Sequence, residues 1–173
     1  MERLETPRLI LRPFEDRDAA DVFEYGRDPR VGPAAGWRPH RDQAESLAII
    51  RTVFAQPGVF ALELKVIGSA GYVGRHQTLL PGPDNEIGYA MSPACWGRGL
   101  MPEAVREILR YGFEDLGLNA QWCGHYDFND RSRRVVEKCG FRYRFTEQTW
   151  VELMGEERTE LHYALTREEW QAL

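Results

Sequence analysis

The chain has 173 residues, 43% of them hydrophobic, and its 27 acidic and 22 basic side chains give a formal net charge of −5 at pH 7. No apolar run approaches the roughly 18 residues of a membrane-spanning helix, the first residues lack the apolar stretch of a signal peptide, and the acidic balance argues against a general nucleic-acid binder. Three cysteines without metal-ligand spacing indicate reduced thiols. The composition therefore predicts a soluble, cytoplasmic protein with one domain, residues 1–173, no metal, and no membrane or nucleic-acid partner.

Two helices are predicted after a short first strand, and a loop rich in proline and glycine separates them. Apolar residues recur at helical spacing in both, and an acidic residue at the start of the first favours a cap there. The predicted ranges are Arg8–Arg12 for the strand, Asp16–Tyr25 and Asp42–Gln56 for the helices and Asp28–Pro39 for the loop, with Asp16 capping the first helix.

The segment from Phe60 to Gly74 alternates apolar and polar residues over an unusual length. As one strand it would span about 50 Å, more than a small domain accommodates. A hairpin of Phe60–Lys65 and Val66–Gly74 fits better, but no turn residues stand between Lys65 and Val66. Either the strand bends there or a turn is missing from the sequence. The second explanation is favoured, because a hairpin needs connecting residues.

Strands and helices alternate in the second half of the chain. Its clearest helix, Pro102–Leu116, begins with a proline suited to a first turn and ends before Gly117, a suitable C-terminal cap. Residues 166–169 form a capping box that opens a last helical turn. The other predicted elements are a loop at Leu79–Asp84, strands at Asn85–Met91, Leu118–Tyr126, Phe141–Thr146 and Glu160–Leu165, and a short helix at Ser132–Lys138.

A glycine turn joins the strand that ends at Met91 to the clearest helix. Gly97 and Gly99 permit positive φ and a close approach of the backbone to a ligand, while the free amides and the dipole of the following helix favour an anion. Arg98 adds a positive charge. The turn therefore predicts a pyrophosphate cradle, although an ordinary strand-to-helix turn is the alternative. It matches neither a P-loop nor a dinucleotide-binding fingerprint.

The segment Trp96-Gly97-Arg98-Gly99-Leu100-Met101-Pro102-Glu103-Ala104, with Glu86-Ile87-Gly88-Tyr89-Ala90-Met91 before it, resembles the coenzyme-A motif of GNAT N-acetyltransferases. The closer resemblance is to the RimJ/RimL-type branch of that family. It covers nearly the whole chain, with the parts in the family's order and spacing. The supporting segments are Thr6–Pro13, Val66–Tyr72, Asn129–Ser132 leading to Glu137–Phe141, and Tyr163–Leu165.

The resemblance implies the α+β architecture of the GNAT fold. Its mixed, mostly antiparallel sheet has helices on both faces, and two central strands splay apart like a V around acetyl-CoA. Tyr89, Ala90 and Met91 would offer backbone groups to the pantetheine arm and the thioester. Asn129 would hydrogen-bond the pantetheine, and Ser132 would lie near the sulfur. The residues implied for the pyrophosphate are Gly97, Arg98, Gly99, Leu100 and Met101.

Two positions depart from the family's pattern. Met101 stands where the cradle usually ends in glycine or alanine. Val136 stands where many GNAT enzymes carry a tyrosine that protonates the leaving thiolate, which excludes a tyrosine acid at that position. Ser132 becomes the candidate for this task, and a plain N-terminal residue of its helix is the alternative.

Transfer to an amine requires a proton acceptor and a donor for the oxyanion. Glu86 opens the strand that carries the donor amides, and it is the first candidate for the acceptor, directly or through water; a solvated glutamate is the alternative. His125 is a candidate base or substrate contact, or else a structural histidine. Trp37, in the proline-glycine loop, is a candidate substrate wall or a packing residue. The late loop carries Glu147, Glu152, Glu156 and Glu157, which would attract a cationic acceptor or simply be solvated.

Two functions remain open from the sequence. The leading hypothesis is an enzyme that moves acetyl from acetyl-CoA to a primary amine by direct attack, the acceptor being a protein N-terminus or a small amine. The alternative is a non-catalytic acyl-CoA-binding sensor or scaffold, which Val136 admits. Amine-dependent release of the CoA thiol separates the two. A homodimer is compatible with either.

Overall fold

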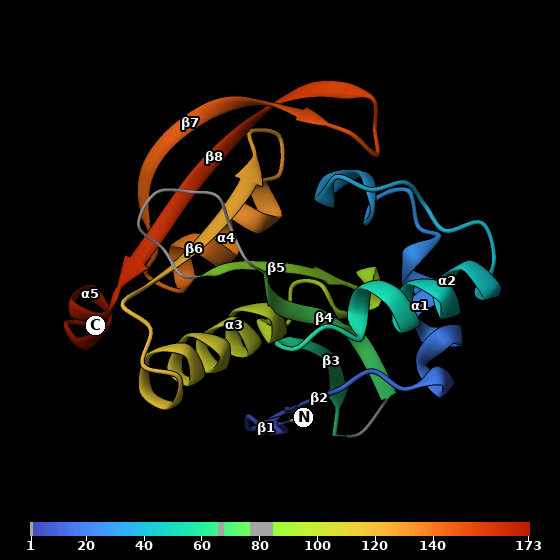
Figure 1. The fold of residues 1–173 in the computed structure, drawn as a ribbon, viewed down its shortest axis with the longest axis horizontal. Coiled ribbons are helices and arrows are strands. Elements are labelled where there is room, and N and C mark those ends of the chain that lie inside the picture. Colours follow the sequence, from blue (N-terminus) through green and yellow to red (C-terminus); the bar gives the residue numbers. More distant parts are fainter. Residues whose placement is uncertain (1, 66–67, 77–84) are drawn as a thin grey trace.

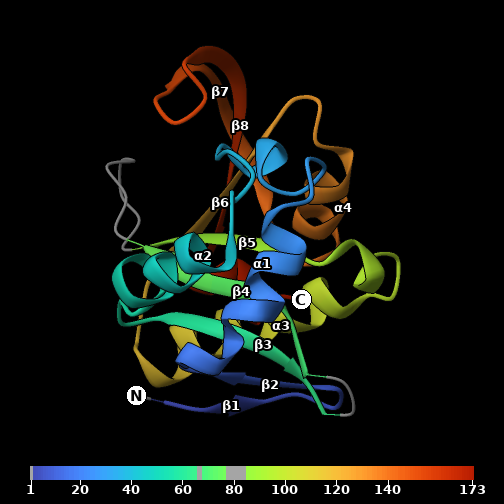
Figure 2. The same cartoon turned by 90° about the vertical axis from the view of Figure 1, so that its right-hand side faces the viewer.

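The computed structural model describes residues 2–65, 68–76 and 85–173 (Figure 1). The strands are β1 (Leu4–Glu5), β2 (Leu9–Arg12), β3 (Val59–Leu64), β4 (Gly68–His76), β5 (Asn85–Met91), β6 (Ala120–Tyr126), β7 (Arg142–Val151) and β8 (Glu156–Thr166). They form one sheet in the order β1-β2-β3-β4-β5-β6-β8-β7. Figure 2 shows this order from β1 and β2 at the bottom to β7 and β8 at the top. That residues 1–173 make one domain stays a prediction.

Five α-helices are described, and short helical turns adjoin them. The α-helices are α1 (Ala19–Gly26), α2 (Gln43–Ile49), α3 (Leu100–Arg110), α4 (Asp130–Lys138) and α5 (Arg167–Gln171). The turns are Asp16–Asp18, Pro33–Ala35 and Pro93–Cys95, which are 3₁₀, and Ile50–Phe54 and Tyr111–Asp115, which are π-helical. Figure 1 shows α1 and α2 on one side of strands β2–β5 and α3 on the other. The predicted α+β class with helices on both faces is confirmed.

The V-shaped splay is confirmed by the pairing of β5 with β6. These strands are parallel and pair only at Asn85↔Gln121 and Glu86↔Trp122. Beyond those pairs β5 continues along β4, and β6 continues along β8 to Tyr126↔Glu160. Every other described pairing in the sheet is antiparallel. The sheet therefore opens between its two central strands from Ile87 onward.

The predicted hairpin of β3 and β4 is confirmed, since the two strands pair from Val59↔Gly74 to Leu64↔Gly68. This register leaves residues 65–67 between the paired ends. That a turn is missing between Lys65 and Val66 stays a prediction. The junction between Lys65 and Val66 lies outside the described residues, as does the predicted loop at 79–84.

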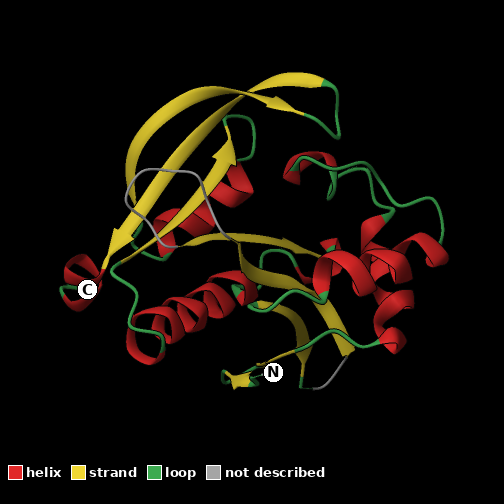
Figure 3. Ribbon diagram, viewed as in Figure 1, coloured by secondary structure: helices red, strands yellow, loops and turns green. Residues whose placement is uncertain are grey.

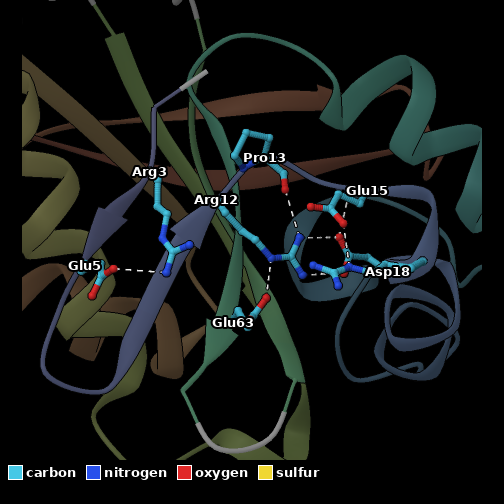
Figure 4. Close-up of polar contacts among 8 residues, drawn as sticks. Arg3, Glu5, Arg12, Pro13, Glu15, Asp18 and Glu63 are labelled. Atoms are coloured by element: carbon cyan, nitrogen blue, oxygen red, sulfur yellow. Dashed lines mark hydrogen bonds and ion pairs between the residues drawn. The ribbon is translucent and has the colours of Figure 1, made fainter.

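The start of the first helix differs from the prediction. Asp42 caps α2, accepting a hydrogen bond from the Glu45 amide. Asp16 does not cap the first helix, and its carboxylate instead pairs with Arg51. Figure 4 shows the reason: Arg12 of β2 binds both carboxylate oxygens of Asp18 at 2.8 and 2.7 Å, and Asp18 accepts a bond from the preceding Glu15 amide. This buried pair ties the start of the helix to the sheet.

The last two strands are longer than predicted and form the ribbon that arches over the molecule in Figure 3. Glu147 lies on β7, and Glu156 and Glu157 lie on β8, so the prediction of an acidic late loop is wrong for these three. Only Glu152 stands in the connecting turn. The hairpin extends because β7 and β8 remain paired out to Val151↔Glu156.

Two apolar clusters hold the helices on the sheet. One lies between α3 and strands β2–β5, where Leu100, Val105, Ile108 and Leu109 are almost fully buried. Burying each such side chain contributes about 1.5–3 kcal/mol. The second cluster lies between α1, the α2 segment and Ala90 of β5. All three cysteines are buried free thiols. Within the described ranges no helix has the length and apolarity to span a bilayer.

Candidate active site

The splay between β5 and β6 opens into a cleft of about 1090 Å³. It is lined by β5, by the turn before α3, by the N-terminal ends of α3 and α4, and by the end of β6. Most residues predicted from the sequence meet there: Glu86, Tyr89, Ala90, Met91, Gly97, Gly99, Leu100, Met101, His125, Asn129 and Ser132. The side chains of Arg98 and Trp37 are not among the lining residues.

The glycine turn has the geometry of an anion cradle. Gly97 and Gly99 have φ of +74° and +72°, a conformation that side chains disfavour. No side chain caps the N-terminus of α3, so the amides of Leu100 and Met101 remain available to a ligand. The Met101 side chain, 6% exposed, packs into the core with α3.

A brace behind the cradle was not foreseen from the sequence. Arg8 donates through Nη1 to the Arg98 carbonyl at 2.8 Å and through Nε to the Glu103 carboxylate at 2.7 Å. The Thr6 hydroxyl also donates to Glu103, at 2.5 Å. Burial alone would raise the pKa of Glu103, but the bonds from Thr6 and Arg8 outweigh it and the pKa is lowered. The Thr6–Pro13 segment therefore neutralises an acidic residue in the first turn of α3.

The cradle end of the cleft is basic. Trp96 donates from its ring nitrogen to the Met91 carbonyl at 2.9 Å, and the guanidinium of Arg131 lies 4.0 Å from the centre of its ring. Arg30 stacks on the same ring at 5.5 Å. Arg134 and Lys138 also line the cleft, Arg134 one turn into α4 and Lys138 at its last residue. The cation–π stack depends on the loop before α2 and on α4, which the sequence pattern does not bring together.

Tyr89 reaches from β5 to the first turn of α4. Its hydroxyl lies 2.8 Å from the Ser132 hydroxyl and 3.3 Å from the Ser132 carbonyl oxygen. Burial raises the pKa of Tyr89 well above its usual range, and it also raises the pKa of the neighbouring Cys123 thiol. Both groups are therefore protonated at neutral pH. The sequence analysis considered only the backbone of Tyr89 and missed this side-chain contact.

Other predicted residues have contacts of their own. Asn129 caps α4 by accepting from the Ser132 amide at 3.1 Å, and it donates to the Ala34 carbonyl at 2.9 Å. His125 is buried, with Nδ1 2.8 Å from the Tyr126 carbonyl oxygen and Nε2 3.3 Å from the Tyr163 hydroxyl. These contacts favour the structural alternative for His125. Trp37 packs beside α1 and α2 with its ring 5.0 Å from that of His40, so a packing role is favoured there too.

The opposite end of the cleft is acidic. Glu86 of β5 and Glu160 of β8 both line it, and one oxygen of each lies within 4.8 Å of the other and of a His162 ring nitrogen. Between them, on β6, Gly124 has no side chain; a Cβ there would lie 2.8 Å from a Glu160 oxygen and 3.4 Å from a Glu86 oxygen. Glu86 was predicted from the sequence, whereas Glu160 was not.

Residues 8–142 match the family model described as the acetyltransferase (GNAT) domain. The chain belongs to the GNAT acetyltransferase family. The predicted family is thus confirmed, and this GNAT protein is an acyltransferase rather than the non-catalytic sensor that the sequence left open.

The similarity to known relatives extends over most of the chain. The chain is 33% identical over 128 residues to an uncharacterized N-acetyltransferase of Bacillus licheniformis, p20, covering 69% of this chain and 70% of the relative. It is 25% identical to the ribosomal protein uS5-alanine N-acetyltransferase of Escherichia coli, covering 97% and 92%, in keeping with the RimJ/RimL-type resemblance. A GNAT acetyltransferase structure from Bacillus anthracis superposes with a TM-score of 0.86 at 24% identity, covering 96% and 99%, a likeness that shows the fold.

Proposed function

We propose that this GNAT enzyme transfers the acetyl group of acetyl-CoA to a primary amine by direct attack, without a covalent enzyme intermediate. The observation that carries the proposal is the division of charge along one cleft. An uncapped helix N-terminus and four basic side chains stand at one end, and two carboxylates stand at the other. The first end suits phosphates and the second suits an ammonium group.

Acetyl-CoA supplies an activated thioester. The residues that would hold it are the amides at Gly97–Met101 for the pyrophosphate and the backbone of Tyr89, Ala90 and Met91 for the pantetheine and the thioester carbonyl. The distance from Glu86 to Met91 along β5 is about 16 Å at a strand rise of roughly 3.3 Å per residue. This length separates the phosphate end from the carboxylate end, as an extended pantetheine arm requires.

The chain's residues have three tasks in the reaction. A backbone amide of β5 donates to the developing oxyanion. A carboxylate at the acidic end accepts a proton from the ammonium group, because only the neutral amine has a lone pair for attack. The Ser132 hydroxyl, in the first turn of α4, is the proposed proton donor to the departing sulfur. No metal takes part in this scheme.

For the acceptor we propose a protein N-terminal amine, with a small primary amine as the alternative. The similarity to the uS5-alanine N-acetyltransferase supports the first. The same cleft has apolar lining residues, Val53, Phe54, Pro57 and Val59, which favour an ammonium group attached to an uncharged residue. The proposal places the reaction in the cytoplasm, in keeping with the three free thiols.

The test is a screen of amines and N-terminal peptides for release of CoA thiol from acetyl-CoA. An alanine- or serine-initiated peptide and the same peptide with a blocked amine form a matched pair. We expect thiol release only with the free amine. Binding of acetyl-CoA without release for any amine in the set would contradict the proposal.

A further inference from the structure

Two carboxylates from distant parts of the chain share the acidic end of the cleft. Glu86 lies at the last pair before β5 leaves β6, and Glu160 lies on β8 opposite Tyr126. The gap at Gly124 lets both reach the same space, because any side chain there would meet a Glu160 oxygen at 2.8 Å. Like charges this close favour the sharing of a proton or of a cationic group.

We propose that Glu160 is the catalytic proton acceptor of the acetyl transfer, and that Glu86 holds the acceptor's ammonium group beside it. The inference rests on the proposed function and deepens it. It assigns the base to a residue outside the coenzyme-A motif and defines the acceptor as a cation that enters between two carboxylates.

The surroundings of the two carboxylates distinguish their tasks. The side chain of Glu160 is 20% exposed and lines the cleft from β8. Burial raises the pKa of Glu160 above its usual range; nearby His162 opposes this increase, and the charge of Glu86 adds to it. A carboxylate with a raised pKa is the better base near neutral pH.

The remaining groups that face Glu160 come from three strands. His162, two residues along β8, is buried, and its Nε2 lies 2.9 Å from a Glu147 oxygen and 4.0 Å from a Glu160 oxygen. Glu147 of β7 is half exposed and raises the pKa of Glu160 slightly further. Tyr126 and Cys123 of β6 have raised pKa values and are neutral. His162 compensates part of the negative charge at this end, and the incoming ammonium group supplies further compensating charge.

Protons and electron pairs balance in the proposed acetyl transfer. The ammonium group gives one proton to the Glu160 carboxylate and becomes a neutral amine. Its lone pair forms the C–N bond to the acetyl carbon, and the electron pair of the C–S bond leaves with the sulfur. A second proton from nitrogen ends on the sulfur, the amide keeps the third, and Glu160 returns its proton to solvent.

The experiment compares Glu160→Gln and Glu86→Gln in the full chain, measuring kcat/KM from pH 5.5 to 9 with the amine found active in the screen. We expect Glu160→Gln to lower kcat/KM by roughly 10²-fold at pH 7. It should also lose the acid limb, the fall of kcat/KM at low pH that protonation of the enzyme's base causes. Glu86→Gln should keep an acid limb, displaced to lower pH because the neighbouring charge is gone, and should raise KM for the amine more than it lowers kcat. Ionisation of the amine itself is common to all variants and cancels in the comparison.

The control for correct folding is the thermal stabilisation by acetyl-CoA, which both variants should retain. Glu168→Gln changes an exposed glutamate on α5, which is not among the residues that line the cleft, and should leave the profile unaltered. Glu160→Asp should recover part of the lost rate. An exchange of the two profiles, in which Glu86→Gln loses the acid limb, would overturn the assignment, as would wild-type kcat/KM in Glu160→Gln.

Two further outcomes are decisive. Turnover that EDTA abolishes and a divalent cation restores would overturn the inference, because Glu86, Glu160 and His162 would then be cation ligands. A wild-type protein that binds acetyl-CoA but acetylates no amine would overturn the proposed function together with the inference. An active wild type with an equally active Glu160→Gln overturns the inference alone.

Discussion

The hydroxyl of Tyr89 lies 2.8 Å from that of Ser132 and joins β5 to α4 beside the point where the sheet splays. Tyr89 is protonated at neutral pH because burial raises its pKa, so it has a proton to donate. When it donates to the Ser132 oxygen, the Ser132 proton is free to point elsewhere in the cleft. The pair places two hydroxyl groups near the position on α4 where Val136 replaces the family's tyrosine.

Removal of either hydroxyl should have a modest effect. The leaving group is a thiol with a pKa of about 8.5, so it can depart as a thiolate and its protonation need not limit the rate. We expect Ser132→Ala and Tyr89→Phe each to lower kcat by less than the roughly 10²-fold typical of a lost acid or base. Because they share one hydrogen bond, the double variant should lose less than the sum of the two effects. Additive losses in steady-state kinetics would show that the two hydroxyls act separately.

Gly99→Val should abolish the binding of acetyl-CoA. A clash within the protein is not the reason, because a Cβ at Gly99 would meet only an Arg8 nitrogen, at 3.7 Å. The cost comes instead from φ of +72° and from a side chain standing where the phosphates approach.

Gly155, in the β7–β8 turn, is the matched control for Gly99. Its φ is +68° and a Cβ there meets nothing within 4 Å. Valine at either position should therefore cost a similar amount of stability, about 1–2 kcal/mol. Only Gly99→Val should lose the thermal stabilisation by acetyl-CoA. Equal stabilisation of both variants by acetyl-CoA would contradict the cradle.

Arg8→Ala should weaken the binding of acetyl-CoA while the protein stays folded. Arg8 neutralises Glu103 in the first turn of α3 and fixes the Arg98 carbonyl, so its loss leaves a negative charge close to the proposed phosphates. Calorimetric titration with acetyl-CoA measures the change. Arg3→Ala is the control, because Arg3 is exposed and pairs with Glu5. An unchanged affinity in Arg8→Ala would show that the brace is irrelevant to the ligand.

Asp18→Asn should destabilise the fold. It removes the bidentate partner of the buried Arg12 guanidinium, while Glu63 still pairs with Arg12. A fully unpaired buried charge costs about 3–5 kcal/mol, so we expect a smaller loss here. Burial alone would raise the pKa of Asp18, but the bonds from Arg12 lower it. The pair therefore stabilises the protein above the unfolded pKa of about 4, and this contribution disappears as pH falls through the folded pKa. Urea unfolding at pH 7 and pH 3.5 should show a smaller pH effect in Asp18→Asn than in the wild type. Asp16→Asn, at an exposed pair, should behave like the wild type.

Local features were predictable where the signal lies within a few residues. The glycines at 97 and 99 and the cap at Asp42 depend on backbone chemistry that adjacent residues define. The choice between Asp16 and Asp18 was not local, since Arg12 on another element selects Asp18. The pairing of the hairpin could not be derived from the alternation of apolar residues, because the register shifts after Leu62, with Val73 opposite Phe60.

The carboxylate pair could not be found from spacing. Glu86 and Glu160 are 74 positions apart and meet because β8 inserts beside β6, a pairing that no short pattern encodes. The choice between a substrate wall and a packing residue for Trp37 could not be made from the sequence for a related reason, since a proline-glycine loop does not reveal which way its side chains face. In contrast, the resemblance to the GNAT family correctly gathered the cradle and β5 residues around one cleft.

The most direct test of the account is a single-turnover reaction followed by mass spectrometry of the enzyme and the peptide together. Enzyme in excess over acetyl-CoA is mixed with the alanine-initiated peptide and quenched at intervals. Direct attack predicts that acetylated peptide and free CoA thiol appear at the same rate, with the mass of the enzyme unchanged throughout. An acetylated enzyme that forms before the peptide product, and disappears as that product grows, would contradict the account.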